Sequence, residues 1–249
     1  MTLPFYVAPE QVMKDRAEYA QKGIARGRSL IATVYRDGIL MVGENPSRSL
    51  HKISEIYDRL AFAGVGKYNE FDQLRVAGIR HADVRGFTYS RDDVDGRSLA
   101  NLYAQYLGQV FTHEMKPLEV EILVVELRPD GSPELYHISY DGTVVDEDSF
   151  VVLGGESASI SERFKAKFEP AWDLSKAFVA CLDSLIEPNR TVKATEIEAA
   201  VLDKNKKPRC FRRLDNSELE ELVTNWQNDR QSKKEDSQKD EFGSTGASN

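Results

Sequence analysis

The sequence predicts an α+β fold, a four-layer αββα sandwich in which two antiparallel sheets lie face to face and helix pairs cover both outer faces. Two observations predict this class. Strand and helix patterns follow one another as strands, two helices, strands, two helices and strands. Asp-Gly pairs between neighbouring strand patterns favour tight hairpins, which join antiparallel strands. The same order is compatible with other α+β folds, and periodicity alone leaves these open.

The chain is expected to begin with a helix followed by a hairpin. Residues 10–26 follow Pro9 and carry apolar side chains at helical spacing. Two apolar strands are expected over 29–35 and 39–42. Between them, Asp37-Gly38 supplies the positive backbone angles of a tight turn, so the first sheet is expected to open as an antiparallel pair.

The middle of the chain predicts a further strand, a helix pair and a second group of strands. The apolar segment 60–65 ends in glycine and is expected to be a strand. Helical patterns over 68–85 and 96–113 are separated by Gly86 and a charged turn. The strands expected next cover 120–127, 135–140 and 150–153.

The last part of the chain again alternates helices and strands before its composition changes. The predicted elements are helices over 159–168, 174–186 and 217–226 and strands over 197–202 and 210–214. From Asn228 onward the sequence is polar, with Phe242 as its one large apolar residue. Such a segment buries too little surface to offset its ordering entropy, so 228–249 is predicted to be a disordered tail. One domain is therefore expected over 9–227, preceded by a short segment, 1–8.

Bulk composition excludes two classes of partner. The 249 residues carry a net charge of −8 and a pI near 5.2, whereas nucleic-acid binders carry a basic surface. No apolar run approaches the roughly 20 residues that cross a bilayer, and the first residues lack the pattern of a secretory signal. We therefore expect a cytoplasmic protein that binds neither nucleic acid nor membrane.

Residue spacing predicts neither a metal nor a cofactor site. Cys181 and Cys210 lie far apart without a CxxC motif, and the four histidines show no HExxH spacing. The sequence also lacks a GxSxG nucleophile elbow, a GxxxxGK[ST] phosphate loop and a GxGxxG fingerprint.

Several long collinear motifs resemble the α subunits of actinobacterial 20S proteasomes, which belong to a family of threonine peptidases. The motifs are 44–50 (ENPSRSL), 52–59 (KISEIYDR), 66–71 (GKYNEF), 95–101 (DGRSLAN), 103–105 (YAQ) and 140–142 (YDG). The resemblance is close over residues 4–155 and loose over 156–226. It implies the N-terminal-nucleophile (Ntn) hydrolase fold with an extra N-terminal helix. It also implies a stack of four rings, two outer α and two inner β, around a proteolytic chamber.

The position of the first strand predicts a non-catalytic subunit of this threonine-type endopeptidase complex. In the Ntn fold the nucleophile is an N-terminal Thr, Ser or Cys, because its own α-amine serves as the base. Here a helix precedes the first strand, so Ser29 or Thr33 could react only after removal of that leader. Ser29 follows Arg28 rather than the glycine of β-subunit processing sites, and Thr33 lies inside an apolar strand. The alternative is an active Ntn hydrolase, either a β-type threonine peptidase or an amidase; a weaker one is an assembly unrelated to degradation.

The resemblance implies a gate at the N-terminus and an activator pocket between adjacent α subunits. The gate would consist of Thr2, Leu3, Pro4, Phe5, Tyr6, Val7 and Ala8, which lack the Tyr-Asp-Arg signature of archaeal and eukaryotic relatives. Lys52 matches the pocket lysine that receives the C-terminal carboxylate of an activator tail. The positions that line or flank this pocket match Glu18, Gly27, Gly66 and Lys67.

The remaining surfaces are implied to be contacts within the particle. The 10–26 helix would lie across the top of a homoheptameric α ring, and the 68–85 helix would face the β ring. The implied partners are α neighbours, β subunits and a ring ATPase of the mycobacterial proteasomal ATPase (ARC) type. That ATPase delivers proteins tagged with Pup, a ubiquitin-like modifier, and ATP-independent activators form a further implied class.

Overall fold

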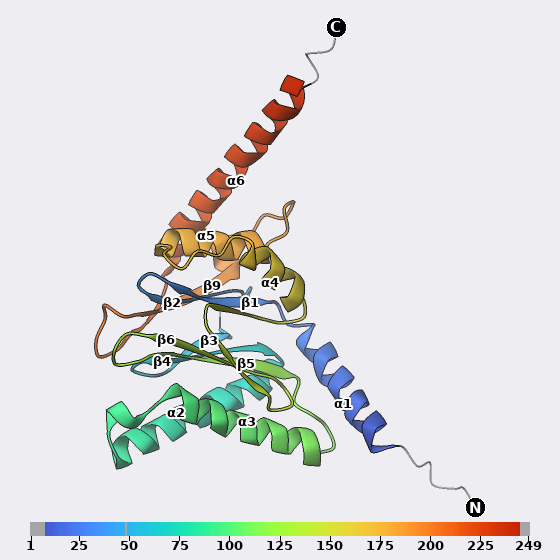
Figure 1. The fold of residues 1–249 in the computed structure, drawn as a ribbon, viewed down its shortest axis with the longest axis vertical. Coiled ribbons are helices and arrows are strands. Elements are labelled where there is room, and N and C mark those ends of the chain that lie inside the picture. Colours follow the sequence, from blue (N-terminus) through green and yellow to red (C-terminus); the bar gives the residue numbers. More distant parts are fainter. Residues whose placement is uncertain (1–7, 48, 245–249) are drawn as a thin grey trace, which may run out of the picture.

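Two antiparallel sheets form the centre of the molecule, with helices on both outer faces (Figure 1). The computed structural model describes residues 8–47 and 49–244, with side chains as far as Gln231. The layers follow one another as α4 and α5, the first sheet, the second sheet, and then α2 and α3 (Figure 1). This arrangement is the predicted four-layer sandwich.

The first sheet contains the hairpin that was expected at the start of the chain. Its strand order is β10-β9-β2-β1-β8, and every pair is antiparallel. Gly38 at the hairpin turn has a φ of +149°, and a Cβ there would lie 1.9 Å from the carbonyl oxygen of Leu202. Glycine is therefore required at this turn. The strands are β1 Leu30–Tyr35, β2 Gly38–Glu44, β8 Phe150–Leu153, β9 Ile197–Asp203 and β10 Phe211–Arg213.

The second sheet is a meander in which each strand pairs with the next along the chain. Its order is β3-β4-β5-β6-β7, again with antiparallel pairs. The strands are β3 Ile53–Tyr57, β4 Leu60–Gly66, β5 Val120–Leu127, β6 Pro133–Ile138 and β7 Val144–Glu147.

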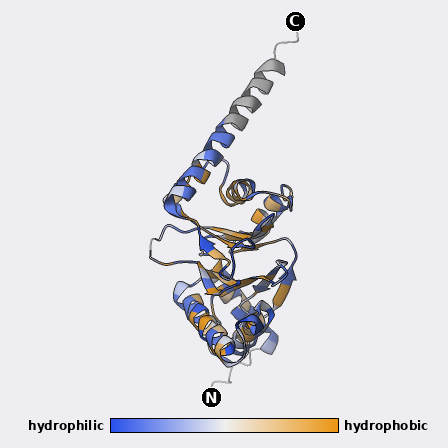
Figure 2. Cartoon of the chain, turned by 90° about the vertical axis from the view of Figure 1, so that its left-hand side faces the viewer, coloured by the Kyte–Doolittle hydropathy of each residue, from blue (hydrophilic) through white to orange (hydrophobic). Residues whose placement is uncertain are grey.

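Helices cover the two sheets because the strands are apolar on both faces. Leu30 and Ala32 of β1 pack between the sheets, whereas Ile31 packs against the layer of α4 and α5. Figure 2 shows apolar residues along the strands and along the helix sides that face them. The helices are α1 Pro9–Ile24, α2 Tyr68–Thr88, α3 Gly96–His113, α4 Ser157–Lys165, α5 Leu174–Leu185 and α6 Asn216–Ser244, with short 3₁₀ turns at Arg91–Asp93 and Ala194–Glu196.

Two edge strands of the second sheet, β3 and β7, are absent from the sequence prediction. Both are short and carry polar residues, since β3 reads ISEIY and β7 reads VVDE. An edge strand needs few apolar residues, so its pattern is weak. The strands and helices that the sequence does predict are present, and their ends, apart from that of the last helix, differ from the predicted ends by a few residues.

The last helix, α6, continues well beyond the end that the sequence predicts. It runs to Ser244 instead of ending near Trp226, and it leaves the body of the molecule (Figures 1 and 2). Arg230 packs over the ring of Trp226, with its guanidinium carbon 4.6 Å from the ring centroid. The helix thus continues past the end predicted near Trp226, whereas the disordered tail predicted for 228–249 stays a prediction.

Two further findings concern the described part of the chain. Every helix in it is too short or too polar to cross a bilayer. It also holds no group of three or more His, Cys, Asp or Glu side chains arranged to bind a metal ion.

Candidate functional site

Lys52 lies at the start of β3, where the edges of the two sheets meet. Its ammonium donates a hydrogen bond to the carbonyl oxygen of Arg28 at 2.6 Å. Its main-chain N–H donates to the carboxylate of Glu198 on β9 at 2.9 Å. Lys52, which leads into the second sheet, is thus held by two groups of the first sheet, the carbonyl before β1 and the Glu198 side chain of β9.

The surroundings of Lys52 favour loss of its proton at mildly alkaline pH. Burial lowers the pKa of Lys52 to about 8, against the opposing charges of Glu198 and Glu44 and with a smaller lowering from Arg28. At neutral pH the group is mainly an ammonium with three N–H donors. The Arg28 carbonyl takes one of them, so the other two can serve an incoming anion.

A cluster of three charged side chains, those of Arg28, Glu44 and Arg190, lies next to the Arg28 backbone. Glu44, at the end of β2, has a buried side chain, and the Arg28 guanidinium lies 2.5 Å from it. Arg190 binds the same carboxylate through two nitrogens, at 2.9 and 2.7 Å. A cavity of 320 Å³ adjoins these groups, and Gly27, Arg28, Glu44 and Arg190 form part of its lining. Sequence reasoning did not single out Glu44, Glu198 or Arg190 as site residues.

Gly27 and Gly66 lie against each other next to this cluster. A Cβ on Gly27 would lie 2.9 Å from the Gly66 amide nitrogen and 2.8 Å from a methyl group of Val65. Gly66 has a φ of +110°, and a Cβ there would lie 2.1 Å from the carbonyl oxygen of Glu119. The turn after α1 therefore presses on the end of β4 so closely that both positions require glycine.

Lys67 belongs to a neighbouring acid–base cluster and not to the immediate surroundings of Lys52. Its ammonium lies 3.3 Å from Glu70 and 4.0 Å from Glu119. Lys116 binds both carboxylates at 2.8 Å. Glu18 is exposed on α1, and its ion pair among the described residues is a 3.9 Å contact with Lys22. The structure thus groups Lys52 with Gly27 and Gly66, and it places Glu18 and Lys67 in separate contacts.

Most of the predicted gate lies outside the described residues. Thr2, Leu3, Pro4, Phe5, Tyr6 and Val7 belong to the part of the chain that the structure does not describe. Ala8 is exposed, and its carbonyl oxygen accepts hydrogen bonds from the first turn of α1 at 2.9 and 3.2 Å.

The two alternative nucleophiles lie in the interior of the chain. Ser29 is half-buried at the start of β1, and its nitrogen forms the peptide bond with Arg28. Thr33 is fully buried, and its hydroxyl is 3.3 Å from the carbonyl oxygen of Val34. Ntn chemistry at either residue would therefore require cleavage of the peptide bond that precedes it.

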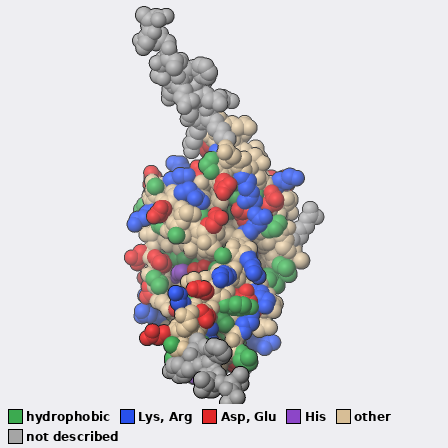
Figure 3. Space-filling model, turned by 90° about the vertical axis from the view of Figure 1, so that its right-hand side faces the viewer, with side chains coloured by type: hydrophobic (Ala, Val, Ile, Leu, Met, Phe, Trp, Pro, Cys, Tyr) green, Lys and Arg blue, Asp and Glu red, His purple; other side chains and the backbone are tan. Residues whose placement is uncertain are grey.

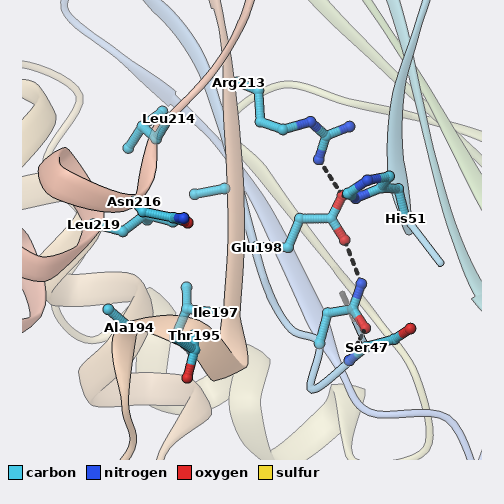
Figure 4. A pocket seen from close by; sticks show the side chains of 12 residues that line it. Ser47, His51, Ala194, Thr195, Ile197, Glu198, Arg213, Leu214, Asn216 and Leu219 are labelled. Carbon is cyan, nitrogen blue, oxygen red and sulfur yellow. Dashed lines mark hydrogen bonds and ion pairs between the residues drawn. The ribbon is translucent and has the colours of Figure 1, made fainter. Parts of the chain in front are cut away.

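A second pocket, of 400 Å³, lies on the other side of Glu198 (Figure 4). Besides the Lys52 amide, the Glu198 carboxylate accepts from Asn45 at 2.7 Å and from the guanidinium of Arg213. The imidazole of His51 lies 3.3 Å from it. Glu198 therefore joins the 45–52 loop to the first sheet. Its signal in the sequence is a charge within the otherwise apolar stretch 197–202 of β9.

Comparison with known proteins identifies the family. The family model described as "Proteasome subunit" matches residues 24–202. A protein from Acidimicrobium ferrooxidans is 60% identical over 224 residues, which cover 90% of this chain and 97% of the relative. Proteins from Sanguibacter keddieii and Thermomonospora curvata are each 52% identical over 90% of this chain, covering 90% and 98% of those relatives. All three are named "Proteasome subunit alpha".

The chain therefore belongs to the proteasome subunit family, whose two-sheet sandwich matches the fold described above. Within this family it groups with the α subunits of actinobacteria. Membership implies assembly with other proteasome subunits, and it confirms the resemblance on which the sequence prediction of fold and family was based.

Proposed function

We propose that this chain is a non-catalytic α subunit that forms the outer heptameric rings of a 20S core in the cytoplasm. There it gates substrate entry and docks activators, and it supports the degradation of intracellular proteins. The observation that carries the proposal is the contact between the Lys52 ammonium and the Arg28 carbonyl. It fixes an ammonium beside Gly27 and Gly66, where the terminal carboxylate of an activator could be received.

The packing of α1 supports a leader that is retained. Ala20, Gly23 and Ile24 are buried on the same chain, and a Cβ on Gly23 would lie 2.2 Å from the Glu119 carboxylate. Removal of the leader would expose this apolar contact, at a cost of about 1.5 to 3 kcal/mol for Ile24 alone. The leader therefore acts as part of the fold and not as a propeptide.

The Lys52 surroundings suit the C-terminal carboxylate of an activator. Two of its N–H groups remain for a charge-assisted pair with a carboxylate, while Gly27 and Gly66 allow close backbone approach. Seven copies in a ring would multiply weak contacts into avidity. This suits a ring ATPase of the ARC type in the Pup pathway and also ATP-independent activators. Glu18 and Lys67 would lie at the margin of the pocket.

Exposed apolar side chains support contacts with neighbouring subunits. Val12, Met13 and Tyr19 are exposed on α1, which would meet adjacent α subunits. Phe87 is 92% exposed near the C-terminal end of α2, which would face the β ring.

On the face at the right of Figure 1, charges of both signs are interspersed (Figure 3). Residues 1–8 would form the gate, ahead of a body that covers 9–227.

The test is co-expression with a β subunit, followed by native mass measurement and electron microscopy. The proposal expects a four-ring particle in which the α chain has the intact mass of its unprocessed sequence. A chain shortened by about 28 to 32 residues, with a new hydroxyl terminus that a covalent inhibitor labels, would instead establish the active Ntn hydrolase. A particle without any peptidase partner would support an unrelated assembly.

A further inference from the structure

The loop after α5 connects the C-terminal helix to the charged groups around Lys52. Arg230 on α6 donates hydrogen bonds to the carbonyl oxygens of Arg190, at 3.2 Å, and Ile186, at 3.0 Å. The Arg230 side chain is itself well fixed. It stacks on Trp226 and lies 3.6 Å from Asp183, to which the Trp226 indole also donates, at 2.8 Å. The helix therefore holds the backbone from which the Arg190 side chain extends.

From Arg190 the contacts continue to Lys52 without a gap. Arg190 makes the two-nitrogen pair with Glu44, and Glu44 binds the Arg28 guanidinium. The Arg28 carbonyl then receives the Lys52 ammonium at 2.6 Å. Residues from α6, the α5–β9 connection, β2 and the start of β1 thus form one continuous network that ends at the proposed docking lysine.

We propose that Arg190 is a positioning residue through which the C-terminal helix fixes the Lys52 ammonium for an incoming carboxylate. The inference rests on the proposed docking function of Lys52. It assigns a role to Arg190 and Arg230, and thereby to the α6 helix, in activator docking.

Burial makes the Glu44 carboxylate the central group of this network. Its side chain is 9% exposed, so loss of one of its two arginine partners leaves a poorly compensated buried charge. Without Arg190, Glu44 would move to regain solvent or a second partner, and Arg28 would move with it. The Arg28 carbonyl would then no longer hold the Lys52 ammonium in place. The pKa of Lys52 responds to the same carboxylate, because the charge of Glu44 partly offsets the lowering by burial.

The test uses the assembled α/β particle and the purified ring ATPase with its native C-terminus. The ATPase concentration that gives half-maximal stimulation of protein degradation is measured with Arg190→Met. We expect this concentration to rise about tenfold, with unchanged maximal stimulation at saturating ATPase, because networked residues couple on this scale. Arg190→Lys keeps one charge for Glu44 and should recover part of the loss.

A matched control separates positioning from general destabilisation. Arg212 makes a similar two-nitrogen pair with Glu218, at 2.5 and 3.0 Å, and its side chain is 40% exposed against 37% for Arg190. Arg212→Met should leave the half-maximal concentration unchanged. Arg230→Met should weaken docking, and the Arg190→Met/Arg230→Met double variant should be no weaker than Arg190→Met alone.

The outcomes distinguish this inference from the function on which it rests. If Lys52→Ala abolishes stimulation while Arg190→Met behaves like Arg212→Met, the positioning role is wrong and the docking site stands. If Lys52→Ala itself has no effect, the docking function fails, and the positioning role fails with it. If the Arg190→Met subunit does not assemble, Arg190→Lys and Arg230→Met are compared with Arg212→Met instead. A half-maximal ATPase concentration equal to that of the wild type in both variants would overturn the proposal.

Discussion

The ammonium of Lys52 lies 2.6 Å from the carbonyl oxygen of Arg28, the residue that directly precedes the first strand. Lys52 comes from the start of β3 in the second sheet, and Arg28 leads into β1 of the first. One hydrogen bond therefore joins the residue before β3 in the second sheet to the residue before β1 in the first.

Replacement of Lys52 by alanine should weaken activator docking without affecting assembly. Loss of a charge-assisted pair with a carboxylate costs about 1.5 to 3 kcal/mol per site. The measurement is ATPase-stimulated degradation, with basal hydrolysis of small peptides as the internal reference. Lys204→Ala is a matched control, because the Lys204 ammonium also donates to an arginine carbonyl, that of Arg36, at 2.6 Å. Equal stimulation in both variants would exclude Lys52 from docking.

Docking should weaken as the pH rises through about 8. Burial lowers the pKa of Lys52 to that value, so the ammonium is present below it and is lost above it. Half-maximal ATPase concentrations measured between about pH 6.5 and 9.5 would show the effect. In Lys52→Arg the charge persists across this range, so the alkaline weakening should disappear. A wild-type profile that is flat across this range contradicts the role of this ammonium.

Gly66→Ala should destabilise the subunit more than the same change at Gly131. Both glycines have positive φ, +110° and +86°, but a Cβ at Gly66 meets the Glu119 carbonyl oxygen whereas one at Gly131 meets nothing within 4 Å. Backbone strain alone costs about 1 to 3 kcal/mol. Chemical denaturation of the two variants isolates the additional cost of the clash, and equal midpoints would mean that the β4–β5 junction relaxes easily.

Deletion of Thr2 to Ala8 should raise the basal hydrolysis of small peptides by the assembled particle. The deletion removes the N-cap residue Ala8 but leaves Pro9–Ile24 and the buried contacts of Ala20, Gly23 and Ile24 in place. Removal of 245–249 at the other end of the chain serves as the control. An unchanged basal rate after the N-terminal deletion would show that this segment does not obstruct the pore.

Local signals in the sequence predicted most of the fold. The β1–β2 hairpin follows from two apolar runs around Asp37-Gly38, and α3 follows from the helical pattern over 96–113 after a charged turn. β3 and β7 were missed because each is short and mixes polar with apolar residues without a clear alternation. The sequence pattern for the last helix ended near Trp226, where its apolar residues end, whereas α6 continues to Ser244.

The site was only partly accessible from the sequence. Lys52, Gly27 and Gly66 were identified through the resemblance to a family and not through residue chemistry. Glu44 and Arg190 are 146 positions apart, and the pairing of β2 with β9 helps to bring their segments together. No local pattern encodes such a long-range contact.

The first turns of α1 have a consequence for the life of a newly made subunit. Within its own chain α1 buries Ala20, Gly23 and Ile24, all near its C-terminal end, while its earlier turns remain exposed. Its earlier turns are held mainly by Arg16, which donates to the carbonyl oxygens of Phe111 and Glu114, and an isolated helix of 16 residues is marginal in water. A solitary chain would thus exchange the amide protons of these first turns readily, and contacts with neighbouring subunits would slow this exchange.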